Sequence, residues 1–80
     1  MKAIKNEADL ATRLSSYLKA HIDDVGLTYA EVAERLSKHG LPGETGESVR
    51  AKLKRGTFPA TFMIALAAAL GLTQIDVRKI

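Results

Sequence analysis

The fold is decided by two stretches of the chain, LTYAEVAERL at residues 27–36 and ESVRAKLKRG at residues 47–56. The first opens with the pattern of a capping box, in which the side chains of Thr28 and Glu31 accept from each other's backbone amides. The second follows a turn rich in glycine and proline and stops at Gly56, a residue that favours a left-handed helix end. Two short helices joined by a turn, the second rich in basic residues, predict a helix-turn-helix element.

Capping signals and apolar periodicity predict further helices on both sides of this element. Large aliphatic residues recur every four positions in the first of them, at Leu10, Leu14, Leu18 and Ile22. The helix expected at residues 60–70 is nearly all apolar, so we expect it to be buried on most sides. The expected helices span about residues 7–25, 28–39, 46–55 and 60–70; at residues 74–79 a short helix and a strand both fit the pattern.

The length and composition of the chain fit one globular domain. With 80 residues, 46% of them hydrophobic, a single domain over residues 1–80 is expected. The predicted fold class is all-α, a compact bundle of four or five helices that contains the helix-turn-helix. Cysteine is absent, so hydrophobic packing must hold the fold without disulfides. The chain shows no secretion signal and no apolar run of membrane length, which favours a soluble cytoplasmic protein without membrane contact.

The sequence offers little for catalysis or metal binding. His21 and His39 lack cysteine partners or a close pair of carboxylates that would complete a metal site. No pattern resembles an activated nucleophile or a glycine-rich phosphate loop. We therefore expect no enzyme activity, no cofactor and no metal.

Positive charge is concentrated in the helix expected at residues 46–55. Four of the twelve cationic residues lie within its residues 50–55 with no acid among them, at Arg50, Lys52, Lys54 and Arg55. Such clustering raises the local potential well above what the net charge of +3 suggests. At 100° per residue, Val49 and Leu53 fall on one side and are expected to face the core, which leaves the opposite arc exposed.

The exposed arc of this helix is predicted to enter the major groove of double-stranded DNA. Arginine and lysine can donate to guanine, glutamate can accept from cytosine, and alanine fits against a thymine methyl group. The candidates that face bases are Glu47, Ser48, Arg50, Ala51 and Lys54. The candidates that contact phosphate are Lys52 and Arg55, with Thr28 and Tyr29 at the start of the preceding helix, where backbone amides and the helix dipole favour anions.

The stretch Leu27-Thr28-x-x-Glu31-Val32-Ala33-x-x-Leu36, followed by residues 49–56 and 62–72, resembles the helix-turn-helix domains of the Cro/C1-type, lambda-repressor-like family. Leu-Thr-Tyr-Ala-Glu-Val-Ala with Lys-Arg-Gly-Thr-Phe is similar, more closely, to a short bacterial helix-turn-helix-like family of unassigned function. The resemblance covers about residues 10–77 and implies a small bacterial or phage-derived transcription regulator. Two features differ from the repressor pattern: the turn at residues 37–46 is several residues longer, and the apolar anchors Val49 and Leu53 are four residues apart where three is more common.

The size of the domain also bears on its partners. A single module of this kind buries only roughly 600–1,000 Å² of its surface on DNA, so useful affinity favours a homodimer on a two-fold site. The apolar residues near the end of the chain, Ile75, Val77 and Ile80, are the candidate dimer contacts. The alternative is a protein-interaction or assembly module that keeps the helix-turn-helix scaffold without binding DNA, which Glu47 and the longer turn favour.

Overall fold

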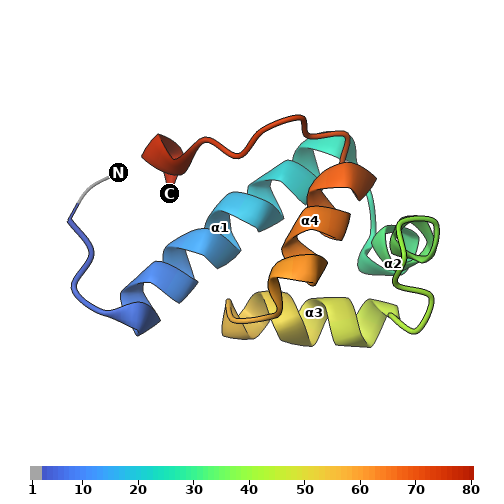
Figure 1. Cartoon of the computed structure of the whole chain (residues 1–80), viewed down its shortest axis with the longest axis horizontal. Helices are drawn as coiled ribbons and strands as arrows, with labels where there is room; N and C mark the ends of the chain where they lie inside the picture. Colours follow the sequence, from blue (N-terminus) through green and yellow to red (C-terminus); the bar gives the residue numbers. More distant parts are fainter. Residues whose placement is uncertain (1–2) are drawn as a thin grey trace.

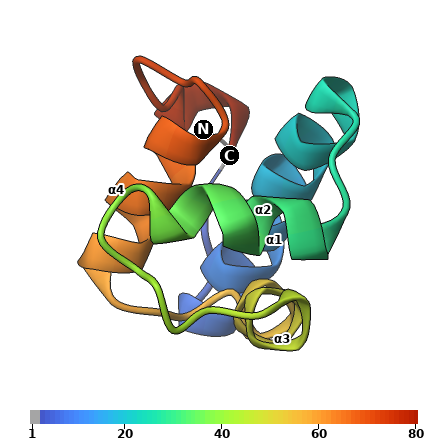
Figure 2. The same ribbon diagram turned by 90° about the vertical axis from the view of Figure 1, so that its right-hand side faces the viewer.

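The longest helix, α1 (Glu7–Val25), supports the rest of the fold in the computed structural model, which describes residues 3–80. After it come α2 (Tyr29–Ser37), α3 (Gly46–Arg55), α4 (Ala60–Ala69) and a 3-10 turn, η1 (Val77–Lys79). No strand occurs within residues 3–80, so the all-α prediction is confirmed. Figure 1 shows α4 in front of α1 and α3 along the lower edge, and Figure 2 shows α2 above α3, which is seen there end-on.

Side-chain caps fix where the helices begin. The Asn6 side chain accepts from the amide of Asp9 at 2.9 Å and starts α1. Thr28 and Glu31 form the predicted capping box of α2, while α3 begins with a second capping box made by Thr45 and Ser48. Each box satisfies two backbone amides that the first turn of a helix leaves without partners. The first residues of α2 and α3 are therefore set by local chemistry.

The core lies where all four helices meet. Its largest fully buried side chains come from every helix: Leu18, Val32, Leu36, Val49, Leu53, Phe62 and Leu66. Burying a side chain of this size contributes about 1.5–3 kcal/mol relative to leaving it exposed. Val49 and Leu53 are among them, so the predicted inward side of α3 is confirmed.

Two glycines allow close backbone contacts to α3. Gly56 ends the helix at a φ of +70°, and a Cβ at this position would lie within 2.9 Å of three backbone atoms of Ala11 in α1. Gly46 begins the helix, and a Cβ there would lie 3.2 Å from the backbone nitrogen of Ala30. The chain between Ser37 and Gly46 thus returns to the start of α2, so that the first turns of α2 and α3 are adjacent.

Three expectations need correction. Helix α2 is shorter than the predicted 28–39, because Thr28 is its cap and residues 38–40 form a turn that ends in Gly40 with φ +94°. Of the two conformations considered for residues 74–79, the structure has neither a full helix nor a strand, only the 3-10 turn at its end. Helix α4 is not buried on most sides, since Ile64 is 71% exposed and Thr61 and Ala68 are also open to solvent.

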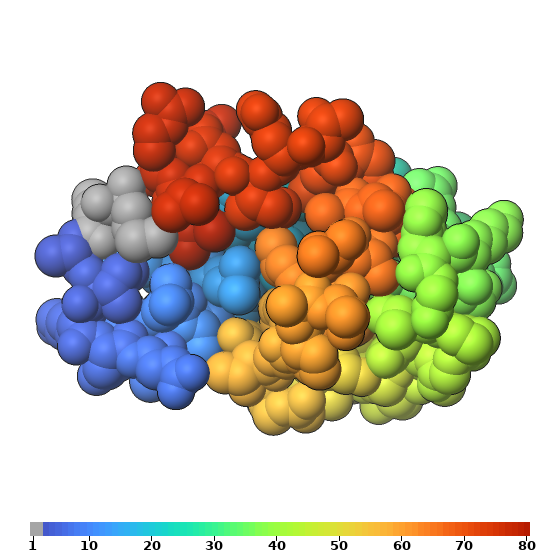
Figure 3. Space-filling model, in the orientation of Figure 1, coloured from blue at the N-terminus to red at the C-terminus, as the bar shows by residue number. Residues whose placement is uncertain are grey.

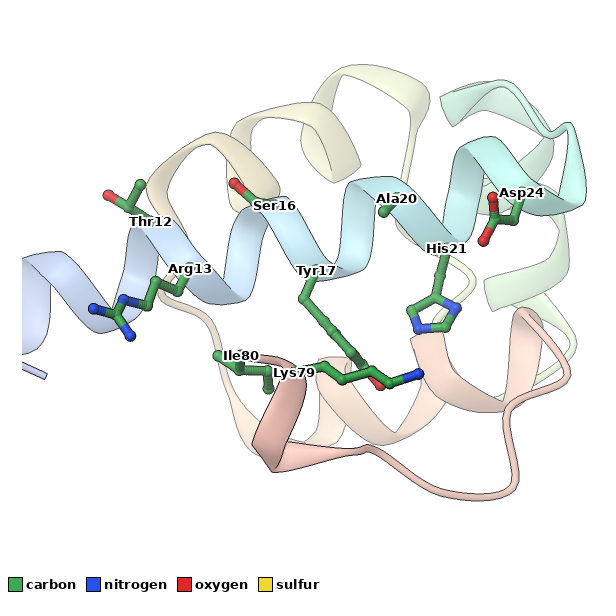
Figure 4. A pocket seen from close by; sticks show the side chains of 9 residues that line it. All are labelled: Thr12, Arg13, Ser16, Tyr17, Ala20, His21, Asp24, Lys79 and Ile80. Atoms are coloured by element: carbon green, nitrogen blue, oxygen red, sulfur yellow. The ribbon is translucent and has the colours of Figure 1, made fainter. Parts of the chain in front are cut away.

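The C-terminal segment folds back over α1. The backbone amide of Asp76 donates to the Tyr17 hydroxyl at 3.0 Å, and the Tyr17 ring packs edge-on against His21. Figure 4 shows these α1 side chains together with Lys79 and Ile80 around an open hollow of about 520 Å³. The hollow is lined by charges of both signs, including Asp24 and Lys79. This segment therefore covers one side of α1, away from α3.

Candidate nucleic-acid interface

The solvent side of α3 carries an open cationic surface. Arg50, Ala51, Lys54 and Arg55 are all exposed, and the Arg50 side chain is 65% accessible. Around Ala51 there is a shallow hollow of about 250 Å³ lined by Glu47, Arg50, Ala51 and Lys54. The structure thus brings four of the five predicted base-facing residues together, with three long polar side chains around Ala51. Long polar side chains around a small residue suit close approach to base edges.

Contacts on the buried side of α3 fix the rotation of this helix about its axis. Val49 and Leu53 are fully buried on the inner side. The buried hydroxyl of Ser15 in α1 donates to the Leu53 carbonyl oxygen, and Gly56 touches Ala11 one turn earlier in α1. Because these contacts lie on one side of α3, the residues on the opposite arc point outward together.

Lys52 does not belong to the open surface, contrary to its predicted role as a phosphate contact. Its ammonium Nζ lies 2.7 Å and 2.9 Å from the two carboxylate oxygens of Glu44, and 5.3 Å from the centre of the Phe62 ring. The side chains of Lys52 and Glu44 are only 23% and 13% exposed. To pair with a phosphate, Lys52 would have to leave Glu44 and so leave a partly buried carboxylate without its partner, which is unfavourable.

Ser48 was predicted to face bases, but its side chain forms hydrogen bonds with the end of the preceding turn instead. Its hydroxyl accepts from the Thr45 amide at 2.7 Å and donates to Glu44 Oε1 at 2.7 Å. Burial of the Glu44 carboxyl opposes its ionisation, but hydrogen bonds from Lys52 and Ser48 outweigh that effect and lower the pKa of Glu44. Glu44 therefore anchors the end of the long turn to α3. The sequence did not indicate this contact, because Glu44 precedes the N-cap Thr45 and so lies outside the helical repeat of α3.

The start of α2 is also less open to phosphate than predicted. The Thr28 amide donates to Glu31 Oε1 at 2.9 Å, so a carboxylate already occupies this end of the helix. That backbone hydrogen bond is the main cause of the lowered pKa of Glu31, which keeps the group negatively charged. Tyr29 is half-buried and packs against the core. Of the four phosphate candidates, Arg55 alone keeps an exposed cationic side chain in residues 3–80 as described.

One acidic residue shares the surface with the cations. The Glu47 side chain is 88% exposed, and its Oε1 lies 3.8 Å from Arg50 Nη1. An exposed pair at this separation contributes at most about 1 kcal/mol and is screened by salt, so it restrains Arg50 only weakly. Arg50 can leave Glu47 for another acceptor at small cost.

Comparison with known proteins places the chain in a family without assigning a role. The profile of a domain of unknown function, DUF6471, matches residues 8–75. The chain belongs to the DUF6471 family. No curated protein and no solved structure matches it.

The described part of the DUF6471 chain has neither a metal-binding cluster nor a membrane-spanning helix. Among residues 3–80, no three His, Cys, Asp or Glu side chains come close enough to hold a metal ion. In the same range, no helix has both the length and the apolarity to cross a membrane.

Proposed function

We propose that the chain binds double-stranded DNA through α3, as a helix-turn-helix regulator. The observation that carries the proposal is the set of exposed cations Arg50, Lys54 and Arg55 around exposed Ala51, on a helix whose other side is fully buried. A helix held in this way presents its outer face without rearrangement, as docking into a major groove requires. The packing of α3 against α2, with their first turns adjacent at Gly46 and Ala30, supports the helix-turn-helix arrangement.

Each exposed side chain has a task in this proposal. Arg50 and Lys54 donate to guanine O6 and N7, and Glu47 accepts from the amino group of cytosine. Ala51 allows the helix to approach closely and packs against a thymine methyl group. Arg55, at the end of α3, binds a backbone phosphate and sets the position of the helix without reading sequence.

Single substitutions on α3 test the proposal. Arg50→Ala and Lys54→Ala each remove an exposed cation whose side chain leaves the core untouched, so both variants should melt like the parent. If Arg50 makes a base contact, its loss costs about 1–3 kcal/mol, or roughly 5- to 150-fold in affinity. The measurement is fluorescence anisotropy with random-sequence duplexes and with any sequence selected from that pool.

Lys79→Ala is the matched control, because Lys79 is an exposed cation of η1 on the side of α1 away from α3. It lowers the net charge by the same amount as the other two variants. Equal affinity of all three variants and the parent would show that α3 does not make the contact. A loss of the same size in all three would indicate only a general effect of net charge.

The alternative is a protein-interaction module on the same scaffold that does not bind DNA. Two carboxylates favour it: Glu47 lies within the cationic surface, and Glu31 occupies the start of α2. Both would repel phosphate. The same titration separates the two functions, since an interaction module shows no salt-dependent affinity for duplex DNA.

A further inference from the structure

An uncharged stretch of the chain includes an exposed side of helix α4. From residue 56 to residue 75 the sequence contains no Asp, Glu, Lys, Arg or His. Helix α4 lies within this stretch and buries Phe62, Leu66 and Ala69 on its inner side. Its outer side exposes Ile64 to 71%, more than any other exposed large hydrophobic residue described in residues 3–80. Surface helices normally carry charged or polar residues on that side.

A groove runs beside the projecting isoleucine. It has a volume of about 530 Å³ and lies between α4 and the turn after α2, with Leu41, Thr61, Ile64, Ala65 and Ala68 along it. Figure 3 shows α4 and this turn next to each other on the face toward the viewer. The same face therefore holds both a projecting apolar side chain and an apolar recess.

We infer that this face, called here the α4 face and comprising Thr61, Ile64, Ala68 and the adjoining groove, binds a second copy of the chain. In a two-fold dimer the same patch meets itself, so it must carry both a projection and the recess that receives it. Ile64 of each copy would enter the groove of the other between α4 and Leu41.

The charge of the α4 face also fits self-association. A two-fold contact brings equivalent surfaces together, and like charges on them would repel. Of the described residues that line the groove, His39 alone can carry a charge. The outer surface of α3 is unsuited to such a contact, because Arg50, Lys54 and Arg55 would face the same cations of the second copy and repel them. The uncharged α4 face is therefore better suited to a two-fold contact than the outer surface of α3.

The dimer contacts predicted near the C-terminus are less suited to an interface than the α4 face. Ile75 and Ile80 are half-buried, which leaves Val77, at 55% exposure, without apolar neighbours of equal exposure in η1. The α4 face replaces them as the candidate. A ten-residue helix is about 15 Å long, so a contact centred on it is smaller than the standard interface of about 800 Å² per partner. We therefore expect a weak dimer in the absence of DNA.

The arrangement also suits a two-fold DNA site, an argument that rests on the proposed function. An axis parallel to the vertical of Figure 1 and in front of α4 would place both α3 helices at the same lower edge. Figure 2 shows α3 in the half of the molecule farther from α4. Both α3 helices would then lie on one side of the dimer, as successive half-sites one DNA turn of about 34–36 Å apart require.

Sedimentation equilibrium without DNA tests the dimer. The parent should pass from monomer toward dimer between about 10 µM and 1 mM, where weak contacts associate. Ile64→Glu and Ala68→Glu each place a charge on the α4 face and should stay monomeric over that range. Val77→Glu is the matched control, an equal change at another exposed aliphatic residue, and should associate like the parent. Circular dichroism of each variant checks that the helices are intact.

The results separate this inference from DNA binding. A parent that stays monomeric up to about 1 mM would overturn the inference, as would α4-face variants that associate like the parent. Association beyond dimer that grows with concentration would contradict the two-fold contact. A parent that dimerises but fails to bind duplex DNA would keep the dimer and remove the proposed function.

Discussion

Replacing Gly56 with alanine tests how α3 is held against α1. At φ +70° this residue is in the left-handed region, which costs an L-amino acid about 1–2 kcal/mol. The added Cβ would also lie within 2.9 Å of the carbonyl oxygen, carbonyl carbon and Cα of Ala11. These are backbone atoms, which cannot relieve the contact by a change of rotamer. Overpacking of this kind adds about 1–3 kcal/mol, so Gly56→Ala should lose roughly 2–5 kcal/mol in total.

Gly71→Ala is the control for the conformational part of this cost. Gly71 has a similar φ of +74°, but a Cβ there would meet nothing within 4 Å. Its substitution should therefore cost about 1–2 kcal/mol. Each kcal/mol lowers the melting temperature of a domain this size by about 4–8 °C, which predicts a fall of about 4–16 °C for Gly71→Ala and about 8–40 °C for Gly56→Ala.

Thermal melting followed by far-ultraviolet circular dichroism, with urea unfolding for the free energies, measures both variants. The stability of an 80-residue domain is roughly 4–12 kcal/mol, so Gly56→Ala is close to the limit of folding while Gly71→Ala is not. If the two variants lose the same stability, α1 and α3 do not meet at Gly56, and the rotation of α3 described above loses one of its supports.

Three further changes test other contacts of the fold. Leu53→Ala empties a fully buried position and should cost about 2–5 kcal/mol by urea unfolding; parent-like unfolding would mean that Leu53 is not in the core. Because folding lowers the pKa of Glu44, its contribution to stability is present above its ordinary value of 4.5 and lost as pH falls below it. Glu44→Gln should therefore make stability less dependent on pH in the acid range, and an unchanged pH profile would argue against the pair with Lys52. Arg35→Ala removes the 3.2 Å hydrogen bond from α2 to the Ala69 carbonyl at the end of α4 and should cost about 0.5–1.5 kcal/mol; a melting curve equal to the parent's would show that this bond does not hold α4.

Local patterns in the sequence predicted the parts of the fold that depend on neighbouring residues. The capping box at Thr28 and Glu31 and the inward pair Val49 and Leu53 were both confirmed. Such features follow from helical spacing and from the few side chains able to accept from a free amide. The exposed position of Arg50 follows from the same spacing.

Contacts made across the fold escaped prediction. Lys52 was expected to be open because its position at the edge of the helix does not show that Glu44 folds over it. Ser48 was also expected to face bases, whereas its hydroxyl caps the start of its own helix, a local contact that the spacing of Thr45 and Ser48 could have indicated. The apolar sequence of α4 indicated burial, but periodicity does not show that one side of this helix, with Ile64 and Ala68, stays exposed.

The corrected site changes the expected electrostatics of binding. The pairing of Lys52 with Glu44 and the carboxylate at the start of α2 leave Arg50, Lys54 and Arg55 as the cations of the proposed interface. Fewer phosphate contacts imply weaker binding by one copy. Dimerisation through the α4 face would compensate, because two linked modules bind a two-fold site with higher avidity than either alone.

The affinity of the parent protein for random duplex DNA, followed from about 50 to 200 mM salt, tests the DNA-binding proposal most directly. On random duplex DNA, Arg50 and Lys54 would pair with phosphates in addition to Arg55. Three cations on phosphates predict that log K falls with log salt with a slope of about −3 for one copy, and about −5 if two copies bind together. Absence of detectable binding at about 50 mM salt, or affinity that does not change with salt, would contradict it.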